Sequence, residues 1–131
     1  MTDWQQVATH VSKITGNIFS PTAPINIGGG CINTAVKLKE GDRCHFVKLN
    51  GIGQLGMFQA ELSGLEEIKQ SNSLRVPQPV CAGTTGSQAY LIVEYIEFSG
   101  NGDTKMAGRQ LAEMHWVTRS KFGWIRDNTI G

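Results

Sequence analysis

A glycine run and a single lysine are the residues of this chain whose types and spacing suit phosphate binding. Gly28-Gly29-Gly30 separates two short β-prone runs, and Lys48 follows the apolar pair Phe46-Val47 at the end of a third. Glycines between strands let backbone N–H groups approach a ligand closely, and phosphates are the usual ligands of such groups. A lysine on a neighbouring strand adds positive charge to the same phosphates. The sequence therefore predicts a nucleotide site.

Two alternatives remain open at this point. Three glycines in a row are also typical of a flexible hairpin turn with no ligand. However, an ammonium group in an apolar strand is costly unless it is paired or ligand-bound, so Lys48 should have a partner. Glu61 is the candidate because it falls within the apolar stripe of a predicted helix, whereas Glu67 points away. The other interpretation is that Glu61 lies at the margin of that stripe and reaches water.

Composition limits the class of protein. The 131 residues are 40% hydrophobic and 18% charged, which predicts one globular domain. The net charge of +1 does not favour nucleic acid or an anionic membrane as a partner. Three cysteines without metal-ligand spacing favour a reducing compartment. No signal peptide is evident, and the longest apolar run, 89–96, is too short to span a bilayer. We therefore expect a cytoplasmic protein.

Hydrophobic periodicity predicts an α+β fold. Residues 50–56 are predicted to form a mobile glycine-rich loop, and 85–87 a hairpin turn. The strand after that turn carries apolar residues on both faces, as a covered central strand does. The predicted elements are a helix over 4–14, strands over 25–27, 33–38 and 45–49, a helix over 57–70, strands over 80–84 and 89–95, and a helix from 103 to about 119.

This order of elements resembles the amino-terminal lobe of protein kinases, a five-stranded antiparallel sheet with a helix after the third strand, here with a leading helix and the first helix of a carboxyl-terminal lobe. From about Gly28 onward the chain resembles the fructosamine (ketosamine) kinase family. The matching motifs are Gly29-Gly30-Cys31-Ile32-Asn33, Phe46-Val47-Lys48-Leu49-Asn50, Met57-Phe58-Gln59-Ala60-Glu61, Val76-Pro77, Leu111-Ala112-Glu113-Met114-His115, Phe122-Gly123-Trp124 and Asp127-Asn128-Thr129-Ile130-Gly131.

The resemblance implies an ATP-dependent kinase that phosphorylates the sugar of ketosamines, fructosamine or ribulosamine, and so starts the repair of glycated amines. It implies ATP and Mg²⁺ as the nucleotide and metal. It also divides the chain into a nucleotide-binding lobe, 1–97, and a hinge with the beginning of a truncated second lobe, 98–131. The alternative function is a kinase-like module that binds a nucleotide, or none, and serves as an interaction surface without catalysis.

The resemblance further assigns roles to individual residues. Lys48 would contact the α- and β-phosphates, and Glu61 would hold it by an ion pair. Val93 would lie at the back of the adenine pocket, and the backbone of Glu94 and Ile96 would bind the adenine edge. The residues expected at the nucleotide are Gly28, Gly29, Gly30, Cys31, Ile32, Asn33, Lys48, Val93, Glu94, Tyr95 and Ile96.

The chain departs from the kinase pattern in several places. Asn33 replaces the third glycine of the phosphate loop, and Ala35 replaces the valine that covers the adenine. Ile125-Arg126-Asp127 lacks the histidine of the kinase catalytic triplet. The resemblance therefore places the catalytic aspartate base and the metal ligands beyond Gly131, with no catalytic residue or metal ligand in this chain. We expect the chain to be a fragment that is inactive alone.

Cys31 directly follows the glycines and is a candidate redox residue. A thiol near backbone N–H groups and Lys48 lies in a positive local field, which favours the thiolate. Two chains would then form a homodimer through Cys31, or exchange the first strand through the flexible Gly28–Gly30 segment. The alternative is that Cys31 is only a small residue suited to a tight loop.

Overall fold

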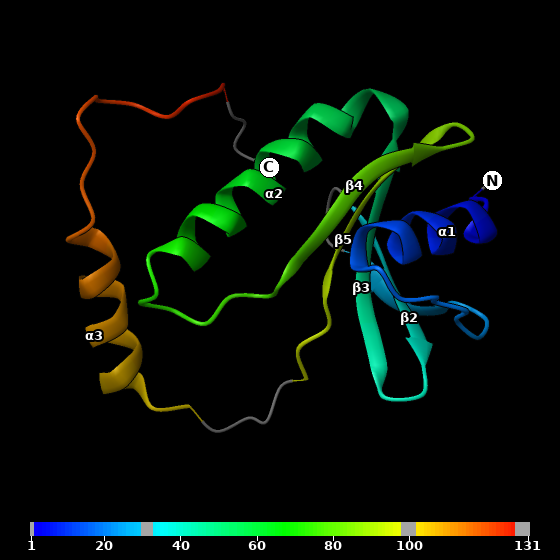
Figure 1. Cartoon of the computed structure of the whole chain (residues 1–131), viewed down its shortest axis with the longest axis horizontal. Helices are drawn as coiled ribbons and strands as arrows, with labels where there is room; N and C mark the ends of the chain where they lie inside the picture. Colours follow the sequence, from blue (N-terminus) through cyan, green and yellow to red (C-terminus); the bar gives the residue numbers. More distant parts are fainter. Residues whose placement is uncertain (1, 30–32, 98–101, 128–131) are drawn as a thin grey trace.

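The computed structural model describes residues 2–29, 33–97 and 102–127. It confirms the predicted α+β fold, with a five-stranded antiparallel sheet, a leading helix and a helix after the third strand (Figure 1). The elements in order are α1 (Trp4–Thr15), β1 (Ile25–Gly29), β2 (Thr34–Glu40), β3 (Arg43–Gly51), the 3₁₀ turn η1 (Ile52–Gln54), α2 (Leu55–Gln70), β4 (Pro79–Thr85), β5 (Gln88–Glu94) and α3 (Thr104–His115).

The strands are ordered β1-β2-β3-β5-β4, and every neighbouring pair is antiparallel. As its apolar sequence predicts, β5 lies inside the sheet, and its residues from Ala89 to Val93 are all buried. The turn between β4 and β5 is tighter than predicted, because Thr85 ends β4 and Gln88 begins β5. Gly86 has φ 56°, a left-handed conformation that suits glycine in a two-residue hairpin.

The two faces of the sheet carry separate cores. Val47 and Leu49 of β3 face α1, together with the buried α1 residues Val7 and Val11. Phe46 alternates with them and faces α2 on the other side, in the cluster around Phe58. Because successive side chains of a strand point to opposite faces, Lys48 shares the α2 face with Phe46. The helix α2 packs mainly over β4 and β5, so the β2 and β3 part of this face lies beside it.

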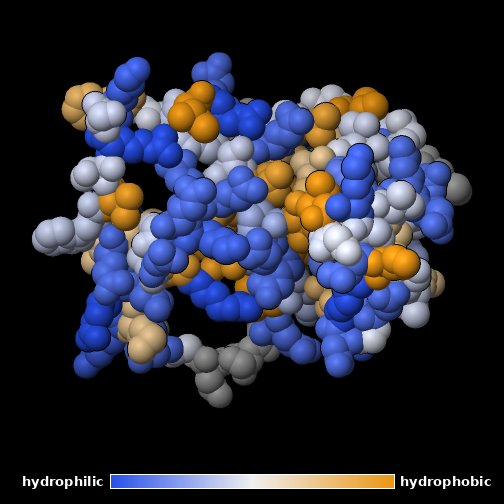
Figure 2. All heavy atoms as spheres, viewed as in Figure 1, coloured by the Kyte–Doolittle hydropathy of each residue, from blue (hydrophilic) through white to orange (hydrophobic). Residues whose placement is uncertain are grey.

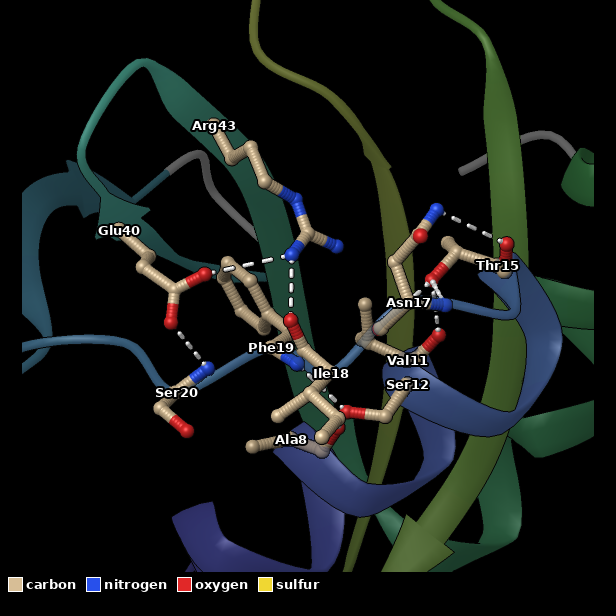
Figure 3. Close-up of polar contacts among 10 residues, drawn as sticks. All are labelled: Ala8, Val11, Ser12, Thr15, Asn17, Ile18, Phe19, Ser20, Glu40 and Arg43. Carbon is tan, nitrogen blue, oxygen red and sulfur yellow. Dashed lines mark hydrogen bonds and ion pairs between the residues drawn. The ribbon is translucent and has the colours of Figure 1, made fainter.

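The segment between α1 and β1 is fixed on the β2–β3 hairpin. The Arg43 guanidinium donates to the Ile18 carbonyl at 2.6 Å and pairs with Glu40 at 3.2 Å, while Glu40 accepts the Ser20 N–H at 2.7 Å (Figure 3). Phe19, between them, is buried, and its ring packs edge-on against His45 with centroids 4.9 Å apart. This network holds the chain where it enters β1, the strand that leads into the glycines.

Two predictions about element boundaries are wrong. Residues 50–56 do not form a loop, because β3 continues to Gly51, η1 follows, and α2 begins at Leu55. The Ile52 N–H donates to the Ser87 carbonyl at 3.0 Å, which fixes this turn against the start of β5. The last helix ends at His115, earlier than predicted, and no α3 residue is buried. No helix in the described part of the chain has the length and apolar character needed to cross a membrane.

Candidate nucleotide site

Lys48 and Glu61 form an ion pair between β3 and α2. The lysine Nζ lies 2.5 Å from a Glu61 carboxylate oxygen, so the partner predicted for this lysine is present. The side chains are 28% and 34% exposed, respectively. Lys48 is thus largely buried in its apolar strand, and the interpretation that Glu61 lies at the margin of its stripe and reaches water is correct in part. Both groups are fixed and remain open to a ligand.

Local packing explains why these two residues meet. Glu61 follows the fully buried Phe58 by three residues, so it lies on nearly the same side of α2. Lys48 is opposite Ala35 on β2 and Leu91 on β5. Leu91 and Phe58 belong to one apolar cluster, and this cluster places the helix beside the lysine.

An apolar surface lies next to the ion pair on the same face. Phe46 is opposite Lys37 on one side and Val93 on the other. Val93 is only 7% exposed, and Phe46 is partly buried against its cluster. Side chains two positions apart along a strand are separated by about 7 Å, so this surface is one step from Lys48. A flat apolar ring and an attached anionic group would fit the two features together.

The end of β5 offers a limited set of backbone groups. The Glu94 N–H donates to the Gln78 carbonyl at 2.8 Å, and the Tyr95 N–H donates to the Cys44 carbonyl at 3.2 Å. Among the hydrogen bonds between described residues, none uses the Ile96 N–H. A ligand here would therefore meet the Glu94 carbonyl and the Ile96 N–H, one acceptor and one donor.

Lys37 ties β2 to the end of β5, a feature that was not predicted. Its Nζ lies 4.3 Å from the centroid of the Tyr95 ring, within the range of a cation–π interaction. Lys37 alternates with Val36 and Leu38 and so shares a sheet face with Lys48. The alternation of charged and apolar residues in β2 was the available signal. The interaction itself crosses β3 and depends on the strand order.

The glycine segment begins with a bulge. Gly28 has φ 98°, its N–H donates to the Asn26 side chain at 2.9 Å, and the register with β2 shifts between these two residues. Only glycine adopts this backbone conformation readily. Gly29 is paired with Thr34, and the Asn33 side chain accepts a hydrogen bond from Asn50 at 2.9 Å. The expectations for Gly30, Cys31 and Ile32 lie outside the described residues.

Two titratable groups with shifted pKa values, His45 and Cys81, lie on the opposite face of the sheet. His45 shares the α1 face with Val47. Burial, followed by the nearby Arg43, lowers the pKa of His45, and Glu94 opposes this effect. Burial also raises the pKa of Cys81, on the same face, to about 12. Within the ranges 2–29, 33–97 and 102–127, no group of three or more histidine, cysteine or acidic residues is arranged to hold a metal ion.

The sheet, the lysine of its third strand and the glutamate of the following helix together define a protein-kinase-like lobe. The sequence profile described as "Fructosamine kinase" matches residues 3–131. The chain therefore belongs to the fructosamine kinase family.

Three relatives illustrate the similarity. A "Probable ketoamine kinase" of Synechocystis is 42% identical, over 98% of this chain and 44% of that protein. A "Protein-ribulosamine 3-kinase, chloroplastic" of Oryza sativa subsp. japonica is 41% identical, over 98% of this chain and 36% of that protein. The crystal structure of a "Putative fructosamine-3-kinase" from Haemophilus somnus 129PT superposes with a TM-score of 0.89 at 21% identity, over 98% of this chain and 44% of that protein. The chain spans less than half the length of each.

Proposed function

We propose that this chain provides the ATP-binding half of a kinase that phosphorylates the sugar of ketosamines, fructosamine or ribulosamine. The Lys48–Glu61 ion pair is the observation that carries the proposal, because it presents a fixed, partly exposed ammonium beside an apolar surface. Membership of the fructosamine kinase family and relatives named ketoamine kinase and ribulosamine 3-kinase support this substrate class.

In this proposal Lys48 contacts the α- and β-phosphates while Glu61 fixes the direction of the ammonium. Phosphoryl transfer relies on positioning and charge stabilisation, so an oriented lysine is more effective than a free one. Gly28 to Asn33 cover the phosphates. The left-handed conformation of Gly28 supports this role because it turns the chain where backbone N–H groups are needed.

The base would lie on the apolar surface next to Lys48. Val93 would form the back of the adenine pocket. Phe46 and Ala35 would contact the face of the adenine ring, and the Glu94 carbonyl and the Ile96 N–H would bind its edge. An adenine amino group donates one hydrogen bond and a ring nitrogen accepts one, which matches the acceptor and donor that the strand end offers. The Lys37–Tyr95 interaction would hold this strand end in place.

The remaining parts of the reaction would come from outside this chain. Residues 1–97 form the nucleotide lobe in our proposal, and 98–131 the hinge and the start of a second lobe. The catalytic aspartate and the Mg²⁺ ligands would follow Gly131, consistent with relatives more than twice as long. The chain alone would bind Mg²⁺–ATP in the cytoplasm without turning it over.

Calorimetric titration with Mg²⁺–ATP tests the proposal. We expect the chain to bind, and Lys48→Met to weaken binding at least tenfold. Lys39→Met is the matched control, because this substitution removes the same charge from an exposed position on the same sheet face. Absence of nucleotide binding to both this chain and a longer form that includes the second lobe would favour the interaction module. Phosphorylation of a fructosamine by this chain alone would refute the division of labour.

A further inference from the structure

Glu67 of α2 connects the carboxyl-terminal segment, residues 119–126, to the helix that carries Glu61. The Trp124 indole N–H donates to one Glu67 carboxylate oxygen at 2.6 Å, and Arg119 pairs with the other at 2.7 Å. Arg126 donates to the Ser63 hydroxyl at 3.4 Å, one turn earlier in the helix. Both oxygens of Glu67 are thus engaged by a segment that is far away in sequence.

The segment reaches α2 from the side opposite the sheet. In Figure 1 the described segment after α3 runs back past α2, and α2 lies between this segment and the sheet. The space-filling view is hollowed between α3 and α2 (Figure 2), and a cavity of about 580 Å³ is found there. Its walls include Glu61, Glu67 and Gly64 of α2 together with Arg119 and Trp124. The cavity therefore joins the ion pair and the carboxyl-terminal segment.

The two glutamates act on one rigid body. Glu67 follows Glu61 by six positions, which places the two about 9 Å apart along the helix axis and about 120° apart around it. Glu61 meets Lys48 of the sheet, and Glu67 meets the carboxyl-terminal segment. Any shift or rotation of α2 that releases one contact therefore changes the geometry of the other.

The apolar contacts of α2 with the sheet lie in its first three turns. Phe58 and Ala60 are buried there, and Leu55, Met57, Leu62 and Leu65 are partly buried against the same cluster, whereas the last turn, which carries Glu67, has no buried residue. A partly exposed ion pair such as Lys48–Glu61 is a weak restraint by itself. The Arg119–Glu67 pair is also partly exposed, but Glu67 has a second donor in the Trp124 indole, and each donor engages a different carboxylate oxygen.

We propose that Glu67 is a positioning residue, through which segment 119–126 sets α2 and thereby the Lys48–Glu61 pair. This inference rests on the proposed nucleotide site. It adds a regulatory connection, because the segment that follows α3 then controls the affinity of the first lobe for nucleotide. Since such coupling is reciprocal, nucleotide binding changes the surroundings of Trp124.

The first test measures Mg²⁺–ATP affinity for Glu67→Gln, Trp124→Phe and the double variant. Glu66→Gln is the control, because it removes the same charge from an exposed neighbouring position. We expect Glu67→Gln and Trp124→Phe each to weaken binding three- to tenfold and Glu66→Gln to leave it unchanged. The double variant should bind no more weakly than Glu67→Gln, because both substitutions act on the same contact, the hydrogen bond between Trp124 and Glu67.

The second test follows Trp124 fluorescence in a chain with Trp4→Phe and Trp116→Phe. We expect saturating Mg²⁺–ATP to change this emission, and Lys48→Met to abolish the change at the same nucleotide concentration. If Lys48→Met weakens binding but Glu67→Gln and Trp124→Phe bind like Glu66→Gln, the inference is wrong and the proposed function stands. If neither the unmodified chain nor the longer form with the second lobe binds nucleotide, both are refuted.

Discussion

Gly83 of β4 provides a quantitative test of the α1 side of the fold. A Cβ added at this glycine would lie 2.6 Å from the Tyr90 hydroxyl oxygen, 2.8 Å from its Cζ and 3.2 Å from His10 Nδ1. Favourable contacts between heavy atoms require about 3.5–4.0 Å, so the Tyr90 ring would have to move by about 1 Å. Tyr90 is buried and its hydroxyl is hydrogen-bonded to His10 at 2.5 Å, so this movement disturbs packed neighbours.

The expected magnitude follows from two opposing effects. Overpacking of a filled core costs about 1–3 kcal/mol. Replacing glycine by alanine also restricts the unfolded chain, which raises the free energy of unfolding by about 0.4–1 kcal/mol. We therefore expect Gly83→Ala to lower the free energy of unfolding by about 1–2 kcal/mol, and Tm by roughly 3–8 °C for a chain of this size.

Chemical and thermal denaturation followed by circular dichroism measure this change. Gly64→Ala, in α2, is the matched control, because a Cβ added at this glycine would lie no closer than 4.0 Å to a neighbouring atom. That substitution should raise the free energy of unfolding by about 0.5–1 kcal/mol through helix propensity. Gly83→Ala should also be less damaging in a Tyr90→Phe background, which lacks the closest contact. Equal or higher stability of Gly83→Ala than of the unmodified chain would refute the packing argument.

Two further predictions concern the opposite faces of the sheet. Burial and then Arg43 lower the pKa of His45 below 6.5, so the folded chain binds its proton less readily than the unfolded chain. The free energy of unfolding should therefore fall as pH drops below about 6.5, by at most about 1.4 kcal/mol per pH unit from this group. Denaturation of His45→Leu should show a smaller fall over the same pH range. Identical pH dependence of the variant and the unmodified chain would contradict this. On the other face, Lys37→Met should weaken Mg²⁺–ATP binding about two- to fivefold in the same titration, because the cation–π interaction with Tyr95 holds the strand end. Lys37→Arg should retain most of the affinity, and equal loss in both variants would exclude a cation–π role.

Local signals in the sequence predict most of the elements. Asp3 caps α1 by accepting the N–H groups of Gln5 and Gln6, and Gly16 ends the helix with φ 76°. Short apolar runs on either side of the Gly86-Ser87 turn define β4 and β5, and the β5 run is apolar on both faces. These signals act within a few residues, so they are readable without a fold. The glycines of 50–56 suggest a loop, whereas the hydrogen bond from Ile52 to Ser87 in the β4–β5 turn supports a helical turn there.

The sequence by itself also determined the central pair of the site, because an ammonium in an apolar strand requires a nearby anion and Glu61 is the acidic residue within the helix stripe. Only the tertiary structure decided how exposed that pair is, since α2 covers β4 and β5 and leaves the lysine at its edge. The same holds for Glu67, which sequence periodicity merely directs away from the sheet. Its contacts with Trp124 and Arg119 depend on a chain reversal after α3, and no local pattern encodes where that segment returns.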